Sequence, residues 1–278
     1  MITDVRTAAD PVRVSRMTTA ELRENFLISS LFTVGKLEMV YSDVDRVIVG
    51  SAVPAGEALK LGVIEELRTE FFLERRELGI LNIGANGVVT VDGVEYRMEN
   101  GDCLYVSRGS KEMTFLSDDN SQPAEFYLAS YPAHADHPTT LAKKADAAAV
   151  HLGAAESCNV RTIYKYIHPE GIRSCQLVMG YTELAEGSVW NTMPSHTHVR
   201  RSEVYMYYDM VDDARVFHYM GEPQETRHLV IGSKEAVISP SWSIHSGSGT
   251  AAYKFCWVMG GENQIFDDMD HLGMDQIL

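Results

Sequence analysis

The chain has 278 residues, of which 45% are hydrophobic and 23% are charged, so it is long enough for two ordinary domains or one large all-β unit with a substantial core. Its formal net charge of −15, from 24 basic against 39 acidic residues, argues against nucleic acid and anionic membrane surfaces as partners, since both require basic patches. No apolar run approaches the roughly 20 residues of a membrane-spanning helix, the N-terminus lacks the apolar core of a signal peptide, and the four cysteines show no CxxC spacing, so we expect a soluble cytoplasmic protein with buried free thiols.

The first half of the chain predicts helices followed by many short strands. Thr18 and Glu21 form a capping-box pattern ahead of Leu22 and Phe26, which predicts the start of a helix. A second helix is expected within residues 55–70. The dipeptide Asp92-Gly93 favours the positive φ angles of a type I′ turn, so residues 88–91 and 94–98 should form a hairpin. The other strands expected here are residues 31–34, 37–41, 46–49, 112–116 and 125–131, together with a strand between two turns within residues 101–109.

The composition changes over residues 132–150 to alanine, proline and polar residues, which is typical of a connection between domains. We therefore expect two domains, residues 1–135 and 136–278. Many short strands with glycine and proline turns predict an all-β fold, a sandwich or barrel in each half. The strands expected in the second half are residues 161–166, 175–184, 203–208, 215–220, 236–239 and 253–259.

Histidines and a carboxylate in the second half form a candidate metal site. His196 and His198 would project from the same face of a strand and could bind one ion. Glu203 lies an odd number of positions from both, so the strand must bend or bulge between Arg200 and Glu203 for the carboxylate to join them. An isolated His-x-His pair usually binds no metal, but His245 adds a third imidazole. Such a set of N and O donors suits zinc, iron, manganese, nickel or copper.

Two strand-rich halves of similar length suggest an internal repeat, with chance similarity as the alternative. Aligning Glu77 with Glu203 places Glu70 and Phe72, instead of histidines, at the positions of the His-x-His pair. The sequence also has no histidine before His134. We therefore expect the N-terminal half to be a degenerate copy without the metal set.

Two short motifs resemble those of the cupin superfamily, a double-sheet jelly roll that holds a metal in its interior, although the spacing after the glycine is looser than usual. They comprise Gly187, His196, His198, Glu203, Pro240 and His245. Longer blocks between residues 72 and 270 are similar to the 5-keto-4-deoxyuronate isomerase family, whose length the chain shares. The blocks are residues 72–79, 190–194, 196–198, 221–228, 238–247 and 261–270.

This resemblance implies a bicupin, with two jelly-roll domains and a few short helices. It implies that one zinc ion per subunit is bound by His196, His198, Glu203 and His245. It also implies a cytoplasmic homo-oligomer, such as a hexamer, acting on sugar acids from pectin or related polyuronides. The implied reaction converts 5-dehydro-4-deoxy-D-glucuronate to 3-deoxy-D-glycero-2,5-hexodiulosonate. A metal with an open coordination position would polarise the carbonyl as a Lewis acid.

Other side chains near these motifs are candidates for proton transfer and substrate binding. Tyr205, Glu225 and His228 are acid/base candidates, with a core aromatic and a solvated loop as the alternatives. Arginine binds carboxylates in bidentate geometry, and tryptophan can line a sugar pocket, although surface ion pairs and core packing are equally ordinary roles. The substrate-binding candidates are Arg161, Lys165, Arg200, Arg201, Arg227, Trp190 and Trp242.

Two other functions fit the same residues. An iron-dependent cupin dioxygenase would use the same four ligands and consume oxygen. A sugar-acid sensor or storage-type cupin would bind its ligand without turnover. The sequence leaves the native metal and the catalytic base open.

Overall fold

The computed structural model describes residues 2, 4–265 and 267–278. The described chain forms two compact units that are not contiguous in sequence. Unit 1 contains the described residues up to Arg6 together with Ser30–Ala147 and Tyr166–Val178, and unit 2 contains Thr7–Ser29, Ala148–Lys165 and Met179–Leu278. These units differ from the expected domains, residues 1–135 and 136–278, because each unit contains segments from both halves of the sequence.

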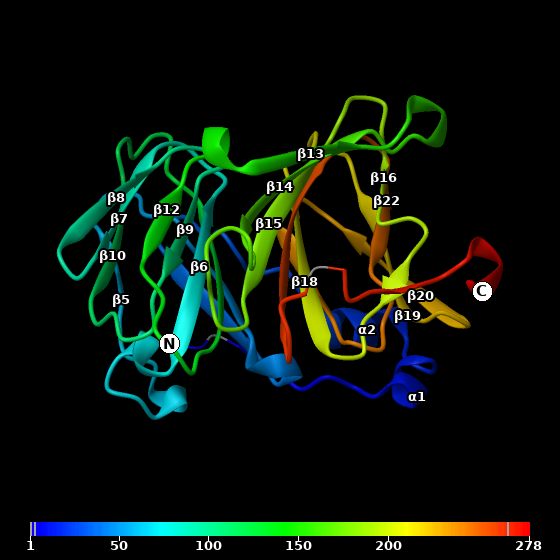
Figure 1. Cartoon of the computed structure of the whole chain (residues 1–278), viewed down its shortest axis with the longest axis horizontal. Helices are drawn as coiled ribbons and strands as arrows, with labels where there is room; N and C mark the ends of the chain where they lie inside the picture. Colours follow the sequence, from blue (N-terminus) through cyan, green and yellow to red (C-terminus); the bar gives the residue numbers. More distant parts are fainter. Residues whose placement is uncertain (1, 3, 266) are drawn as a thin grey trace. The chain divides into compact units, whose positions relative to one another are not determined.

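Unit 1 is built from a seven-stranded and a four-stranded sheet (Figure 1). The larger sheet has the spatial order β1 (Asp4–Arg6), β3 (Leu37–Ser42), β4 (Ile48–Ala52), β11 (Phe126–Pro132), β6 (Arg76–Asn82), β9 (Cys103–Val106) and β12 (Thr140–Ala142). The smaller sheet has the order β5 (Leu59–Leu61), β10 (Met113–Ser117), β7 (Gly87–Val91) and β8 (Val94–Met98).

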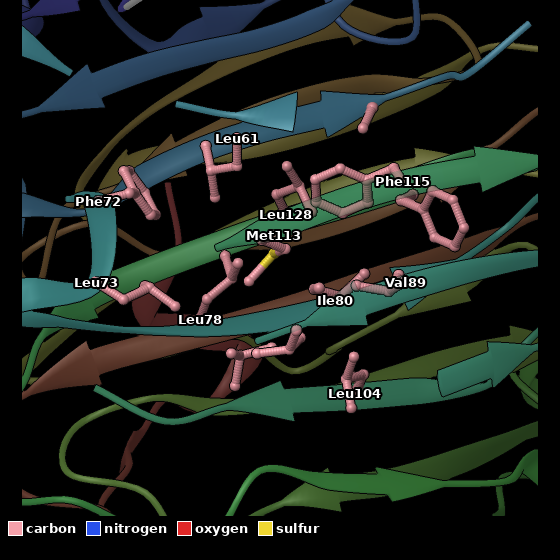
Figure 2. Packing of buried hydrophobic residues seen from close by; sticks show 14 of the residues in the cluster. Leu61, Phe72, Leu73, Leu78, Ile80, Val89, Leu104, Met113, Phe115 and Leu128 are labelled. Carbon is pink, nitrogen blue, oxygen red and sulfur yellow. The ribbon is translucent and has the colours of Figure 1, made fainter. Parts of the chain in front are cut away.

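The core of unit 1 lies between these two sheets (Figure 2). Leu78 and Ile80 on β6 are two positions apart, so both side chains leave the same face of the larger sheet. They meet side chains such as Val89 and Phe115 from the smaller sheet, and all four are buried. Burying each such side chain contributes roughly 1.5–3 kcal/mol.

Unit 2 repeats the two-sheet design. Its seven-stranded sheet has the order β13 (Ala148–Leu152), β14 (Arg161–Ile167), β15 (Val178–Leu184), β23 (Lys254–Gly261), β18 (Arg201–Tyr208), β21 (Glu235–Ser239) and β2 (Leu27–Ile28). Its four-stranded sheet has the order β16 (Trp190–Asn191), β22 (Ser246–Gly249), β19 (Val216–Glu222) and β20 (Glu225–Ile231). A two-stranded ladder joins β17 (His196–Thr197) to β24 (Asp270–His271).

The strand orders of the two units match, with β11-β6-β9 of unit 1 corresponding to β23-β18-β21 of unit 2. Each unit is thus a double-sheet jelly roll, and the expected all-β bicupin fold is confirmed. Arg76 begins β6 opposite Pro132, the last residue of β11, and Arg201 begins β18 opposite Gly261, the last residue of β23. This register places Leu78, not Glu77, at the position of Glu203, so the sequence alignment of the two glutamates was wrong by one residue.

Helices are few and short. α1 spans Pro11–Val14 and α2 spans Thr19–Phe26, where Thr18 and Glu21 form the expected capping box. The helix expected over residues 55–70 was wrong: that segment contains β5 and only one turn of 3-10 helix. The 3-10 helices are Val44–Arg46, Glu65–Leu67, Phe72–Glu74, Lys144–Asp146, Ala155–Ser157 and Met274–Gln276.

Most expected strands are confirmed within a few residues of their bounds. Asp92 and Gly93 have φ angles of 47° and 83°, and Val91 pairs with Val94 across the turn, as the Asp-Gly dipeptide predicts. Residues 31–34 are not a strand. The segment expected to be a connection, residues 132–150, contains β12, a 3-10 turn and the start of β13.

Candidate metal centre

Four buried side chains of unit 2 converge on one point. One donor atom from each of His196, His198, Glu203 and His245 lies within 4.8 Å of every other. The Nε2 atoms of His196 and His245 are 2.9 Å apart, and the Glu203 Oε1 atom lies 2.7 Å from His198 Nε2 and 3.4 Å from His245 Nε2. This group is the one cluster of three or more potential ligands in the part of the chain that the structure describes.

Backbone carbonyls orient two of the imidazoles. His198 Nδ1 lies 2.6 Å from the carbonyl oxygen of Asp268, and His245 Nδ1 lies 3.4 Å from that of Ser243. A carbonyl oxygen only accepts, so each Nδ1 carries the proton and donates it, which leaves the Nε2 lone pair facing the cluster. The same arrangement fixes histidine ligands in metal proteins.

Three separate segments bring the ligands together. His196 lies on β17, which pairs with β24, and His198 follows that strand. The chain bends at residues 199 and 200 before β18 begins, so Glu203 turns its carboxylate toward the histidines, as the odd spacing required. His245 ends the loop between β21 and β22.

The electrostatics of the cluster follow from its burial. Burial lowers the pKa of His196 to about 2, and the neighbouring His245 adds to the effect. Burial alone would raise the pKa of Glu203, but interactions with His245 and His198 hold it well below its usual value. At neutral pH Glu203 is therefore a carboxylate and His196 is a neutral imidazole.

This donor set fits a transition metal ion. Bonds of about 2.0–2.1 Å to N or O donors place neighbouring ligand atoms about 2.9–3.4 Å apart for right-angle to tetrahedral geometry. The separations of 2.9 and 3.4 Å agree with this range, and that of 2.7 Å lies just below it. A proton on His198 Nε2 would satisfy its contact with Glu203 alone, whereas one metal ion would satisfy all four donors at once.

A cavity of about 310 Å³ opens beside the cluster, at the lower end of the range for small-molecule sites. Its polar lining includes the ligands His196 and Glu203, and its apolar lining includes Phe255 and Trp257. The other lining residues are Leu152, Arg161, Ile163, Thr182, Thr192, Met193, Pro194, Arg201, Tyr205, Met259, Met269 and His271.

Besides His196 and Glu203, three of the sequence-predicted residues line this cavity. Arg161, at the start of β14, is half-buried and donates to the carbonyl of Asn159 at 2.8 Å, and burial lowers its pKa. Arg201 is buried and donates to the carbonyls of Ile265 and Asp268. Tyr205 lies two positions beyond Glu203 on β18, with its hydroxyl 3.2 Å from Thr192 Oγ1. Burial and the nearby Glu203 raise the Tyr205 pKa well above its usual value.

The remaining candidates do not line the cavity, and their functional roles stay predictions. Glu225 and His228 are exposed on β20. Arg200 is exposed and forms an ion pair with Glu262 at 2.9 Å, and Arg227 donates to the carbonyls of Val14, Ser15 and Met17.

Lys165 is half-buried on β14, also outside the cavity lining. Trp190 stacks on Tyr219, and Trp242 lies in the turn before His245. The substrate-binding role of both tryptophans stays a prediction.

Several cavity residues carry no prediction from the sequence. His271 faces the site because β24 pairs it with His196, and their ring centroids are 5.9 Å apart. Trp257 lies on β23 and donates from its indole nitrogen to Thr182 Oγ1 at 3.2 Å. Residues 261–270, one of the blocks that resemble the isomerase family, end one residue before His271. This proximity was the one signal in the sequence that could have pointed to His271.

Among the described residues, no helix is long and apolar enough to cross a membrane. The four cysteines are free thiols, as expected. Cys103 and Cys256 are buried, Cys175 is half-buried, and Cys158 is exposed at a turn with φ of 51°. The expectation of burial is therefore confirmed for two of the four thiols.

Comparison with known sequences places the chain among named enzymes. The KduI/IolB family matches residues 27–274. The chain is 56% identical over 267 residues to a 4-deoxy-L-threo-5-hexosulose-uronate ketol-isomerase of Lachnoclostridium phytofermentans, covering 96% of this chain and 97% of that protein. It is 50% identical over 276 residues to the protein of the same name from Escherichia coli, covering 99% of each.

Solved structures share the fold at low sequence identity. An IolB-like protein from Salmonella typhimurium has a TM-score of 0.73 at 14% identity, covering 89% of this chain and 97% of that one. An oxalate decarboxylase has a TM-score of 0.61 at 9% identity, covering 89% of this chain and 79% of that one. These similarities concern the arrangement of strands.

Proposed function

The chain belongs to the KduI/IolB family, and from that premise we propose that it is the metal-dependent isomerase that converts 5-dehydro-4-deoxy-D-glucuronate to 3-deoxy-D-glycero-2,5-hexodiulosonate. The observation that carries the proposal is the buried His3Glu cluster beside a cavity lined by Arg161 and Tyr205. The two relatives named above, both ketol-isomerases, match this chain over nearly its whole length.

His196, His198, Glu203 and His245 would hold one zinc ion per subunit. When bound, the metal would act as a Lewis acid that polarises the substrate carbonyl and stabilises negative charge on oxygen as the neighbouring carbon loses its proton. Three imidazoles and one carboxylate suit zinc, and the carbonyl contacts at Asp268 and Ser243 keep two imidazoles in the required tautomer.

Arg161 is the group best suited to bind the carboxylate of the sugar acid. It lines the cavity, it is half-buried, and it forms no ion pair with any described residue. Arg201 also lines the cavity, but its guanidinium already donates to two backbone carbonyls, so it fixes the segment around Asp268. A bidentate arginine contact would set the direction in which the sugar lies across the cluster.

The carbonyl shift removes a proton from C2, delivers one to C1 and moves a third between the two oxygens. Tyr205 carries its proton at neutral pH, so its hydroxyl can donate a hydrogen bond to a substrate oxygen beside Glu203. His271 also lines the cavity and offers an imidazole outside the ligand set, with its ring centroid 5.9 Å from that of His196. The apolar side chains of Phe255, Trp257 and Met259 exclude water from the reacting carbons.

We further propose that the enzyme acts in the cytoplasm, in the degradation of pectin or related polyuronides, and that it assembles as a homo-oligomer such as a hexamer. Four free thiols are compatible with a reducing compartment. Light scattering on the purified protein measures the oligomeric state.

The proposal is tested by incubating the purified protein with 5-dehydro-4-deoxy-D-glucuronate and following the aldehyde proton by NMR, with and without chelator. We expect the aldehyde signal to disappear without oxygen consumption, and only in the protein that has kept its metal. Oxygen uptake would favour the dioxygenase alternative, and binding without turnover would favour a sugar-acid sensor. Either outcome would overturn the isomerase proposal.

A further inference from the structure

Unit 1 contains a cavity of about 520 Å³ that has no part in the reaction described above. Its charged lining consists of Arg46, Arg75 and Arg76 against a single acidic residue, Glu66. The remaining lining residues are Ile2, Val5, Tyr41, Leu67, Thr69 and Pro132. The cavity therefore carries an excess of positive charge in a protein whose net charge is −15.

Arg76 is the buried cation of this cavity, with only 6% of the residue exposed. Its Nε donates to Ser130 Oγ at 3.1 Å, and its Nη2 donates to the carbonyls of Arg46 at 2.5 Å and Ser130 at 2.8 Å. Within the described part of the chain, Nη1 donates to no partner and no carboxylate forms an ion pair with this guanidinium. Burial lowers the Arg76 pKa to about 10.

Glu77, the next residue along the chain, partly offsets the Arg76 charge without forming an ion pair with it. The buried charge remains costly, because carbonyl and hydroxyl oxygens replace only part of its hydration. An anion that enters the cavity would supply a direct counter-charge and accept from Nη1. Thr69 Oγ1 also lines the cavity and is a buried polar atom without a hydrogen-bond partner in the described structure. These two polar groups would be satisfied together by a ligand that has both a carboxylate and hydroxyl groups.

The repeat supports this interpretation. Arg76 and Arg201 begin corresponding strands of the two jelly rolls and are both buried at cavities. In unit 2 the carboxylate of Glu203 lies two residues beyond Arg201, whereas the residue two beyond Arg76 is Leu78, which packs in the core. Unit 1 has thus kept the arginine and lacks the acidic ligand.

We propose that this cavity of unit 1 is a non-catalytic binding site for a small hydroxylated carboxylate, a sugar acid of the hexuronate class. The carboxylate binds Arg76 and Arg46, and the hydroxyl groups face Thr69. The choice of a sugar acid, among organic anions, rests on the proposed function, whereas the anion site itself rests on the charges of unit 1. The site binds without turnover, because no group of metal ligands occurs among the described residues of unit 1.

The test uses D-glucuronate as the probe and the full-length R161Q/H245A variant, which lacks the carboxylate-binding arginine and one metal ligand of unit 2. Isothermal titration calorimetry should give one D-glucuronate per chain in this variant, and no binding of uncharged D-glucose. This variant should not turn over substrate, so the calorimetry measures binding alone. The result of the calorimetry is therefore independent of the isomerase assay on the unmodified enzyme.

Two further substitutions in the same background locate the site. R46E reverses an exposed charge that forms no ion pair with any described residue, so the fold should tolerate it, and we expect affinity to fall at least about tenfold. The matched control R97Q removes an exposed arginine of unit 1 on β8, outside the cavity, and should leave affinity unchanged. The proposal is overturned if D-glucuronate does not bind to R161Q/H245A, or if R46E and R97Q bind it equally well.

Discussion

His198 Nδ1 donates to the carbonyl oxygen of Asp268, 70 residues further along the chain, at 2.6 Å. The same carbonyl accepts from Arg201 Nη2 at 3.5 Å. Asp268 and the strand β24 thereby lie beside the His3Glu cluster, where β24 pairs with β17. The segment that follows the last long strand is therefore part of the site.

Removing this segment should weaken metal binding. A chain that ends at Gly261 loses the acceptor that orients His198, and the loss of such a partner typically lowers metal affinity about 10–100-fold. Competition with a chromogenic chelator measures this affinity. The matched control ends at Leu272 and keeps both Asp268 and His271, so it should bind the metal as the full chain does. Equal affinity of the two truncated chains would contradict the role of the Asp268 carbonyl.

Replacing Tyr205 by phenylalanine should lower kcat while the metal content stays the same. The hydroxyl lines the cavity beside Glu203, and removal of a proton-donating group typically costs about 10²–10⁴ in rate. The control is Y207F, since Tyr207 is buried on the same strand but its hydroxyl contacts His218 at 2.8 Å and it does not line the cavity. If Y207F and Y205F lose kcat equally, packing and not the Tyr205 hydroxyl is responsible.

Glu225 and His228 are the other two acid/base candidates that the sequence suggested besides Tyr205. Both are exposed on β20, so E225Q and H228Q should keep kcat/KM within about twofold of the unmodified enzyme. A large loss in either variant would restore the catalytic role that the sequence suggested for these residues.

Replacing Arg161 by glutamine should raise KM for the sugar acid about ten- to hundredfold, because a hydrogen bond to a charged group contributes roughly 1.5–3 kcal/mol. Steady-state kinetics on R161Q measure this effect. R200Q is the matched control, since Arg200 is exposed and paired with Glu262. An unchanged KM in R161Q would show that another group binds the substrate carboxylate.

His218 should make stability depend on pH. Burial lowers its pKa from 6.5 to about 3, so between these values the unfolded chain takes up a proton that the folded protein excludes. The contribution of neutral His218 to stability is complete above pH 6.5 and is lost as pH falls toward 3. At pH 5 the loss amounts to about 2 kcal/mol.

The H218N variant tests this dependence, because asparagine does not titrate. Urea unfolding gives the free energy of unfolding of each protein at pH 7 and at pH 5. The decrease from pH 7 to pH 5 should be about 2 kcal/mol smaller in H218N than in the unmodified protein. The same pH dependence in both proteins would mean that His218 is not the group responsible.

Local chemistry accounts for what the sequence predicted correctly. The capping box at Thr18 and the turn at Asp92-Gly93 depend on neighbouring residues alone, so both were confirmed. The odd spacing of Glu203 from the histidines required a bend, and the structure has one at residues 199 and 200. The convergence of His196, His198, Glu203 and His245 could be predicted because few residue types bind transition metals and these four occur in a compact pattern.

Features that depend on tertiary pairing were not predictable from the sequence. The apparent helix at residues 55–70 forms β5 instead, because β10 offers that segment a partner strand. His271 enters the cavity through a two-residue pairing with β17, and nothing in its own neighbourhood indicates this. Because Glu77 and Glu203 are both glutamates, the sequence suggested aligning them. The strand pairings instead align Leu78 with Glu203. A shift of one residue matters, because it turns a side chain to the opposite face of the sheet.

The most direct test of the central claim is the metal content of the purified protein and of its H245A variant, measured by inductively coupled plasma mass spectrometry. The buried cluster predicts close to one transition metal ion per chain in the unmodified protein, and a content near zero, with loss of isomerase activity, in H245A. An unmodified protein that is fully active without metal, or an H245A variant that keeps a full complement of metal, would contradict it.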